Sequence, residues 1–208
     1  MNTLKITRFL LAFFTLALLT NCASGYKLIN PETINYKSGD QAEGVSLQYK
    51  YDLLDKKYAK KEVKKDVKLV AIKVTNNTDR DLTFGNEIKL TYENGNQVLV
   101  MDNTKVFKDL KQSPATYLFY LLLTPINLYT SSSSDGYNED TNSFPIGLIV
   151  GPGLAGGNMI AAGSANKKFE TELLTYDING TVIPKGETRY GLIGINSDSF
   201  DALKIKLD

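Results

Sequence analysis

The sequence predicts a mainly β protein, an antiparallel β-sandwich interrupted by an inserted apolar α-helical hairpin. Two observations predict this fold. Apolar and polar residues alternate with period two over much of residues 45–110 and 170–208, which places the apolar side chains on one face of each strand. Between these regions the alternation stops, and two blocks without a charged residue follow, residues 112–134 and 141–166.

Short strands separated by turn sequences account for the first β region. Residues 45–53 alternate strictly, and residues 67–75 (VKLVAIKVT) are apolar enough to form a central strand. Residues 76–80 (NNTDR) predict a turn, because Asn, Asp and Thr side chains bond to their own backbone. Asn94-Gly95 lies between two strand-like runs, residues 87–92 and 97–101, and predicts a hairpin.

The second β region is predicted in the same way. Its expected strands are residues 172–178, 181–183, 190–195 and 203–207, with turns at Asn179-Gly180 and at residues 184–186. Seven or eight short strands with turn signals about every ten residues are typical of an antiparallel β-sandwich.

Residues 56–68 contain seven lysines against Glu62 and Asp66. We interpret this segment as a solvated connection or sheet edge, where lysines discourage pairing with another chain. The alternative is that its positive charge holds the domain near anionic headgroups.

The amino terminus predicts export. Lys5 and Arg8 precede an eleven-residue apolar run at residues 9–19, FLLAFFTLALL, which is typical of a signal peptide. The only cysteine of the chain, Cys22, follows directly after this region. Residues 1–22 therefore resemble a bacterial lipoprotein signal, which implies removal of residues 1–21 and lipidation of Cys22. By the same resemblance, Ala23 in place of an Asp favours the outer membrane.

The predicted domains are a lipoprotein signal peptide at residues 1–21, a tether at residues 22–44, and a single β-sandwich domain at residues 45–208. The apolar helical insertion interrupts this domain at about residues 112–168. The tether is predicted because Gly, Ser, Asn and Pro recur without any period.

The turn sequences carry a second resemblance. LVAIKVTNNTDRDL at residues 69–82, the Asn94-Gly95 hairpin, and IPKGE at residues 183–187 before a Gly-Leu-Ile strand resemble immunoglobulin-like domains of bacterial envelope lipoproteins, many of them uncharacterised. This resemblance implies an immunoglobulin-like sandwich and a cell-envelope location. It implies no site chemistry, because a fold does not determine an activity.

The two uncharged blocks predict a helical hairpin with an acidic tip at residues 135–140. Tyrosines near the ends of the first block are typical of a membrane interface, and small residues at every fourth position allow helices to approach closely. We expect contact with a membrane or a protein partner; burial in the domain core stays open as the alternative. The candidate contact residues are Tyr117, Phe119, Tyr120, Leu122, Ile149, Gly151, Gly153 and Gly157.

Composition excludes several functions. The chain has no His and one Cys, so catalytic triads with His and zinc sites built from His or several Cys are excluded. With 24 basic and 23 acidic residues among 208, it has no basic excess for nucleic acid. Residues 151–156 match G-x-G-x-x-G, but the surrounding hairpins do not form the βαβ unit that a dinucleotide requires. We expect no enzyme activity, no cofactor and no metal.

The sequence therefore predicts a lipid-anchored envelope protein that acts as a binding or structural module. Its partners would be the membrane, through Cys22 and the apolar hairpin, or an envelope protein. The alternative function is a hydrolase or small-ligand-binding lipoprotein that uses carboxylates and tyrosines in a pocket.

Overall fold

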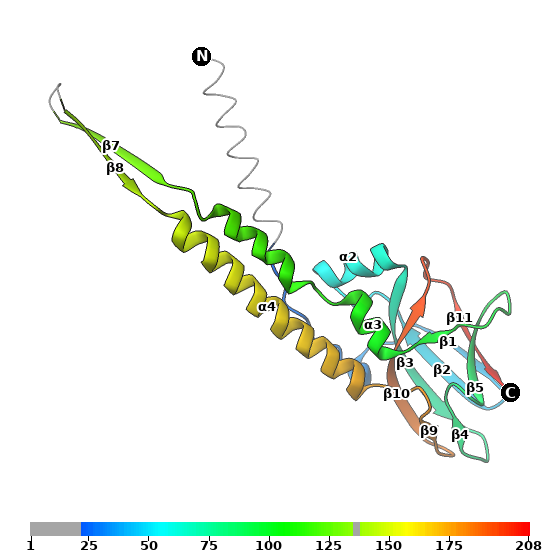
Figure 1. Ribbon diagram of the computed structural model, residues 1–208. Helices are drawn as coiled ribbons and strands as arrows, with labels where there is room; N and C mark the ends of the chain where they lie inside the picture. Colours follow the sequence, from blue (N-terminus) through cyan, green and yellow to red (C-terminus); the bar gives the residue numbers. More distant parts are fainter. Residues whose placement is uncertain (1–21, 135–137) are drawn as a thin grey trace. The chain divides into compact units, whose positions relative to one another are not determined.

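The computed structural model describes residues 22–134 and 138–208 (Figure 1). The predicted signal peptide and residues 135–137 of the predicted acidic tip lie outside the described residues. The chain divides into two compact units. We call Tyr26–Gln112 with Ala165–Asp208 the sheet unit, and Met1–Gly25 with Ser113–Ser164 the hairpin unit.

A five-stranded antiparallel sheet organises the sheet unit. Its order is β1 (Ser38–Ala42), β2 (Val45–Lys50), β3 (Val67–Asn76), β10 (Thr188–Asn196) and β6 (Val100–Met101). The central strand β3 is buried along both of its faces through its first six residues. This explains why its sequence is a nearly continuous apolar run, and it confirms the prediction of a central strand at residues 67–75.

Two short ribbons cover one face of this sheet. They pair β4 (Leu82–Thr83) with β9 (Val182–Ile183), and β5 (Ile88–Tyr92) with β11 (Leu203–Leu207). The larger hydrophobic core lies here, and it gathers alternate residues of β2 and β3 such as Leu47 and Ile72 with Phe84 and Leu90. The apolar residues that alternate with period two in these strands therefore point into this core.

Helices cover the other face of the sheet. They are η1 (Pro31–Thr33), α2 (Lys56–Lys65), α3 (Asn103–Leu110) and the part of α4 (Gly147–Thr175) from residue 165 onward. A second core forms where Tyr58 of α2, Leu110 of α3 and Phe169 of α4 pack with Leu69 and Leu192 of the sheet, and all five side chains are fully buried.

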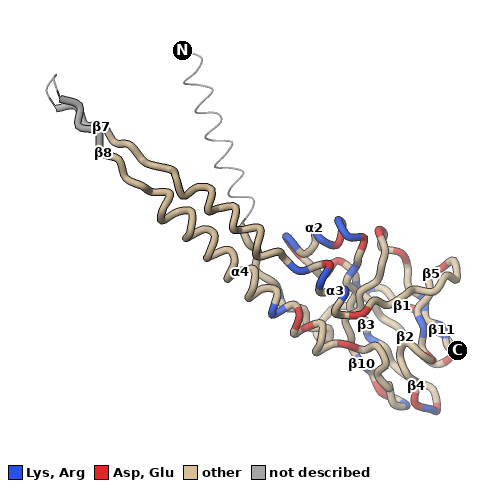
Figure 2. Tube along the Cα trace, viewed as in Figure 1, with Lys and Arg blue, Asp and Glu red and all other residues tan. Residues whose placement is uncertain are grey.

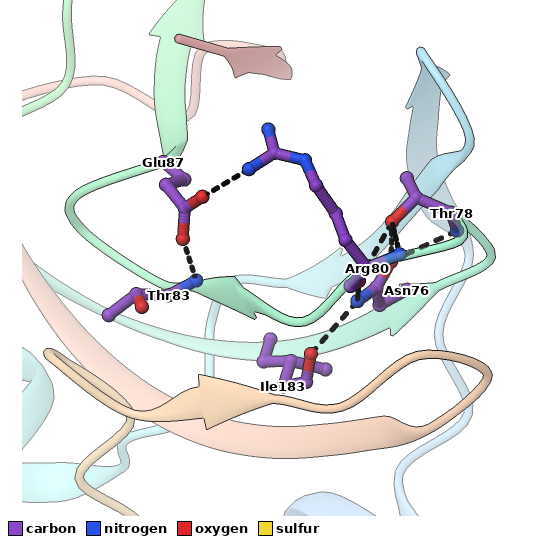
Figure 3. A network of polar contacts seen from close by, with 6 residues as sticks. All are labelled: Asn76, Thr78, Arg80, Thr83, Glu87 and Ile183. Atoms are coloured by element: carbon purple, nitrogen blue, oxygen red, sulfur yellow. Dashed lines mark hydrogen bonds and ion pairs between the residues drawn. The ribbon is translucent and has the colours of Figure 1, made fainter.

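The turn after β3 forms as predicted (Figure 3). The side-chain oxygen of Asn76 accepts hydrogen bonds from the backbone N–H of Thr78 at 3.0 Å and from its hydroxyl at 2.6 Å. The Asn76 amide donates to the carbonyl oxygens of Arg80 at 2.8 Å and Ile183 at 2.9 Å. Glu87 then joins Arg80 to the backbone of Thr83. Asn76 is fully buried, and both its side-chain oxygen and its side-chain NH₂ group form hydrogen bonds.

The hairpin unit contains η2 (Pro114–Leu123), β7 (Leu128–Ser134), β8 (Asn138–Phe144) and the first part of α4, up to residue 164. β7 and β8 form an antiparallel ribbon in which Leu128 is opposite Phe144. The predicted helical hairpin is therefore wrong at its tip, where the backbone forms a ribbon. Ser and Thr dominate β7, and their side chains compete with helical hydrogen bonding.

The predicted fold class holds in part. The strands are antiparallel as expected, but the chain is a mixed α and β protein and not a mainly β one, and its layers do not clearly form an immunoglobulin sandwich. The expected strand at residues 172–178 is wrong, because α4 continues to Thr175. Residues 56–65 form a helix where a connection or edge was predicted.

The predicted tether at residues 22–44 is also wrong over most of its length. β1 is the edge strand of the main sheet, and Ile29 is 7% exposed within the second core. Asn30 caps η1 by accepting from the backbone N–H of Glu32. Gly and Asn occupy turns and caps here, so their recurrence reflects tight local geometry and not a flexible linker.

Candidate functional site

Two long stretches of the hairpin unit carry no charge. No Asp, Glu, Lys or Arg occurs in residues 113–134 or 141–164. Figure 2 shows this as an uninterrupted tan stretch through η2 and the first part of α4, whereas blue and red alternate over the sheet unit. The exposed apolar residues of η2 and the first part of α4 therefore have no opposite charged face that would turn to water.

Apolar side chains are exposed in this unit at high density. Among the described residues, twelve large apolar side chains are exposed in the hairpin unit, against six in the longer sheet unit. The twelve, which we call the apolar surface, are Leu118, Phe119, Leu121, Leu122, Ile126, Leu128, Tyr129, Phe144, Leu148, Ile149, Val150 and Ile160. Exposed apolar patches on this scale mark membrane or protein contact sites.

Three predicted contact residues belong to this surface. Phe119 is 72% exposed, Leu122 74% and Ile149 64%. The alternative of burial in the domain core does not hold for these side chains. Tyr117 and Tyr120, in contrast, are buried, so the prediction that they make outward contacts is wrong.

The spacing of the buried residues explains this division. Tyr117, Tyr120 and Leu123 are the buried residues of η2, one every third position. Because a 3₁₀ helix has 3.0 residues per turn, such positions align on one face. The two tyrosine rings are parallel, with centroids 6.4 Å apart, and they pack with Ala155 and Ala162 of α4.

The predicted glycines also divide between two faces of α4. A Cβ on Gly151 would lie 2.9 Å from the Thr124 hydroxyl and 3.1 Å from the Tyr120 carbonyl oxygen, so Gly151 allows η2 to pack closely. Gly153 and Gly157 have open space where a Cβ would be, so they pack against no other element among the described residues, and their contact with a membrane or partner stays a prediction. Since α4 begins at Gly147, the G-x-G-x-x-G match lies inside a helix and does not form a phosphate-binding loop.

The predicted lipidation residue lies on the same unit. Cys22 is exposed. Burial raises the pKa of Tyr120, and the neighbouring Cys22 side chain raises it further, so Cys22 lies beside Tyr120. The backbone N–H of Ala23 donates to the side-chain oxygen of Asn158 in α4 at 2.5 Å, and Ala23 packs beside Tyr117 and Tyr120. The first residues after the predicted cleavage site are thus attached to η2 and α4.

A separate polar contact attaches the next residues to the sheet unit. Both carboxylate oxygens of Glu172 accept hydrogen bonds, from the hydroxyl of Tyr26 at 2.5 Å and from the backbone N–H of Ile29 at 2.7 Å. Burial raises the pKa of Glu172, and these two bonds partly offset the rise. No local signal indicates this contact, because residues 172–178 alternate like a strand.

Glu172 also lines a cavity of about 320 Å³ with Leu28, Lys168 and Tyr176. The alternative function requires a carboxylate that is available to a substrate in such a cavity. Both Glu172 oxygens instead bond to the N-terminal segment, so we assign Glu172 a structural role.

A polar cleft of about 480 Å³ lies at the loop after β10. Asp66, Asp198 and Asp201 line it together with the side chains of Asn94 and Asn96. Within residues 22–134 and 138–208, no three His, Cys, Asp or Glu residues are grouped as metal ligands. The aspartates are therefore spread around the cleft.

Among the described helices, α4 alone is long and apolar enough to cross a membrane, and 28% of its most apolar window is buried. No protein-family model, curated protein or solved structure matches the chain.

Proposed function

We propose that the chain is a lipid-anchored cell-envelope protein that acts as a binding or structural module, and that its apolar surface enters the lipid. The observation that carries this proposal is the attachment of Cys22 and Ala23 to η2 and α4. The residue predicted to carry acyl chains thus lies on the unit that exposes twelve large apolar side chains. A lipid bilayer would accept both the acyl chains and the exposed apolar side chains.

The fold and location belong to the same proposal. We also propose an immunoglobulin-like sandwich for the sheet unit, and the two β-layers around its larger core support this proposal. The outer membrane is favoured by Ala23 after the cysteine, through the resemblance to lipoprotein signals.

The ribbon limits how deeply the hairpin unit enters. Two strands alone leave unpaired backbone groups along their outer edges, and such edges do not occur in hydrocarbon. β7 and β8, which connect the end of η2 to the start of α4, therefore stay in water. We propose that η2 and the first part of α4 lie along the membrane. The nine residues of the apolar surface that lie outside β7 and β8 then enter the leaflet that carries the acyl chains.

The size of the effect follows from the exposed fractions. Full burial of a Phe, Leu or Ile side chain contributes about 2 kcal/mol. Phe119, Leu122 and Ile149 are about two-thirds to three-quarters exposed, so together they contribute roughly 4 kcal/mol on entering lipid. Each 1.4 kcal/mol corresponds to a tenfold change in partitioning, so their loss weakens binding by roughly a thousandfold.

The test uses the unacylated mature chain, Cys22→Ser, with vesicles of phosphatidylcholine. We expect it to float with the vesicles, and we expect Phe119→Ser/Leu122→Ser/Ile149→Ser to remain in solution. The matched control replaces exposed apolar residues of the sheet unit, Leu99→Ser/Leu174→Ser/Phe200→Ser, which are 74%, 64% and 60% exposed. If the apolar surface contacts only a protein partner, the Cys22→Ser chain, the triple variant and the control will all remain in solution, and the proposal will be refuted.

Acylation is tested separately. Labelled palmitate supplied to bacteria that express the full chain should be incorporated, and Cys22→Ser should abolish incorporation. Incorporation that persists in the variant would contradict lipidation at Cys22.

A further inference from the structure

Helix α2 presents a dense positive surface. Six of its ten residues are lysines, and its one acidic residue, Glu62, is buried and accepts a hydrogen bond from the backbone N–H of Leu69 at 2.8 Å. We call these lysines the lysine face: Lys56, Lys57, Lys60, Lys61, Lys64 and Lys65.

The helical period explains the separation of charge from the core. Tyr58 and Glu62 are four residues apart and share the buried side of α2. Lys56, Lys60 and Lys64 follow the same spacing on the opposite side and are exposed. Figure 2 shows the resulting run of blue along α2.

Little negative charge balances these lysines locally. Within the part of the chain that the structure describes, Lys56, Lys60, Lys61, Lys64 and Lys65 make no ion pair within 4.0 Å. Burial lowers the pKa of Lys61, and the neighbouring charges of Lys65 and Lys64 lower it further, while Asp109 partly opposes this. The lysines are thus close enough to repel one another, and bound anions would relieve the repulsion.

Only a short segment of chain lies between Cys22, the residue proposed to carry acyl chains, and the first contact with α2. Tyr26 packs edge-on against Tyr58 in the first turns of α2, with ring centroids 5.2 Å apart. Only residues 23–25 separate Tyr26 from Cys22. At no more than about 3.6 Å per residue, the Cα atoms of Cys22 and Tyr26 are at most roughly 14 Å apart.

We propose that the lysine face binds the headgroups of anionic phospholipids in the membrane to which Cys22 is anchored. This inference rests on the proposed lipid anchorage, which holds α2 at the headgroup level. The lysines then act as a second, electrostatic attachment and orient the sheet unit on the membrane. Surface lysines near an anionic bilayer each strengthen binding by about fivefold.

The test compares neutral and anionic vesicles. The unacylated mature chain, Cys22→Ser, is titrated with phosphatidylcholine vesicles and with vesicles that also contain phosphatidylglycerol. Binding to neutral vesicles reports on the apolar surface, and the additional binding to anionic vesicles reports on the lysine face. The failure of this inference and the failure of the proposed function are therefore distinguishable.

Matched variants assign the additional binding to α2. Lys56→Gln/Lys60→Gln/Lys64→Gln should weaken binding to anionic vesicles by roughly a hundredfold, at about fivefold per lysine, and leave binding to neutral vesicles unchanged. The control removes three exposed lysines elsewhere on the sheet unit, Lys37→Gln/Lys50→Gln/Lys185→Gln, for the same change in net charge.

Salt provides an independent measurement. The additional binding of the unsubstituted lysine face should disappear at about 1 M salt, where the screening length is only about 3 Å. Equal losses in the α2 variant and the control variant would overturn the inference, because the effect would then follow net charge alone. Additional binding that the α2 substitutions leave intact would also overturn it.

Discussion

Glu62 should make the sheet unit less stable as the pH rises. Its side chain lies on the buried side of α2 and is 5% exposed. Burial raises its pKa from 4.5 to about 7, although the hydrogen bond from the Leu69 N–H and the charge of Lys68 act in the opposite direction. The negative charge of Asp52 adds a smaller rise.

The sign and size follow from the two pKa values. Below about pH 4.5 the carboxyl group is protonated in the folded and unfolded states alike, and it has no effect on their balance. Between pH 4.5 and 7 the unfolded chain releases its proton first, so the free energy of unfolding falls. At 1.36 kcal/mol per pKa unit, the total loss is about 3 kcal/mol above pH 7.

The variant Glu62→Gln removes the charge and keeps an oxygen for the Leu69 N–H. We expect it to raise the free energy of unfolding at pH 8 by up to about 3 kcal/mol and to have little effect at pH 4. The assay is urea unfolding followed by circular dichroism at several pH values. Glu93→Gln, at an exposed turn position, is the control and should change little at any pH.

The difference between variant and parent isolates Glu62 from other groups, because Asp40 and Asp102, whose pKa values are lowered, titrate equally in both proteins. A variant that is less stable than the parent at pH 8 would refute the reasoning. The carboxylate would then stabilise the fold as a charged partner of Lys68.

Two further substitutions test packing and the buried turn. Gly147→Ala should destabilise the hairpin unit, because its Cβ would overlap backbone oxygens at the end of η2. Gly153→Ala has open space around the new Cβ and should raise the free energy of unfolding by about 1 kcal/mol. Thermal unfolding of both variants distinguishes them, and equal effects would contradict the packing of η2 on α4. Asn76→Asp loses the bond donated to the carbonyl oxygen of Ile183 and buries a charge, so we expect a loss of about 3 kcal/mol, or roughly 10 °C in Tm. Asn94→Asp, at an exposed turn, is its control, and a similar Tm for the two variants would count against the network.

Local signals predicted much of the β structure. The apolar run at residues 67–75 is the central strand β3, and the turn at residues 76–80 forms through Asn76 and Thr78. Asn94-Gly95 turns the chain with Gly95 at a φ of 81°, a conformation that glycine adopts without steric cost. In each case the residues that decide the structure are neighbours in the sequence.

The helices were harder to predict. Only Tyr58 and Glu62 mark the inner side of α2, and a Glu among lysines gives no apolar period. Residues 172–178 alternate like a strand, yet Leu173 is buried with Phe169 four residues earlier on one face of α4. Packing against the sheet makes both segments helical, and it overrides their weak local preference for another secondary structure.

The candidate site was predicted as a segment and not residue by residue. The lack of charge identifies residues 112–134 and 141–166 as unusual, and Phe119, Leu122 and Ile149 are exposed there. Tyr117 and Tyr120 were predicted as contacts because tyrosines near the ends of an apolar block are typical of a membrane interface, whereas the 3₁₀ period turns both inward.

The sequence by itself determined the regions of apolar alternation, the turns between them, the uncharged excursion and the position of the single cysteine. These properties depend on residue type and local spacing, which the chain carries before it folds. Only the tertiary structure decided that Cys22 lies beside Tyr120 and that Glu172 binds Tyr26 and Ile29. It also decided that Lys56, Lys60 and Lys64 lie on the side of α2 opposite the buried Glu62. These arrangements depend on tertiary packing, because segments that are distant in the sequence meet only when burial of apolar surface brings them together.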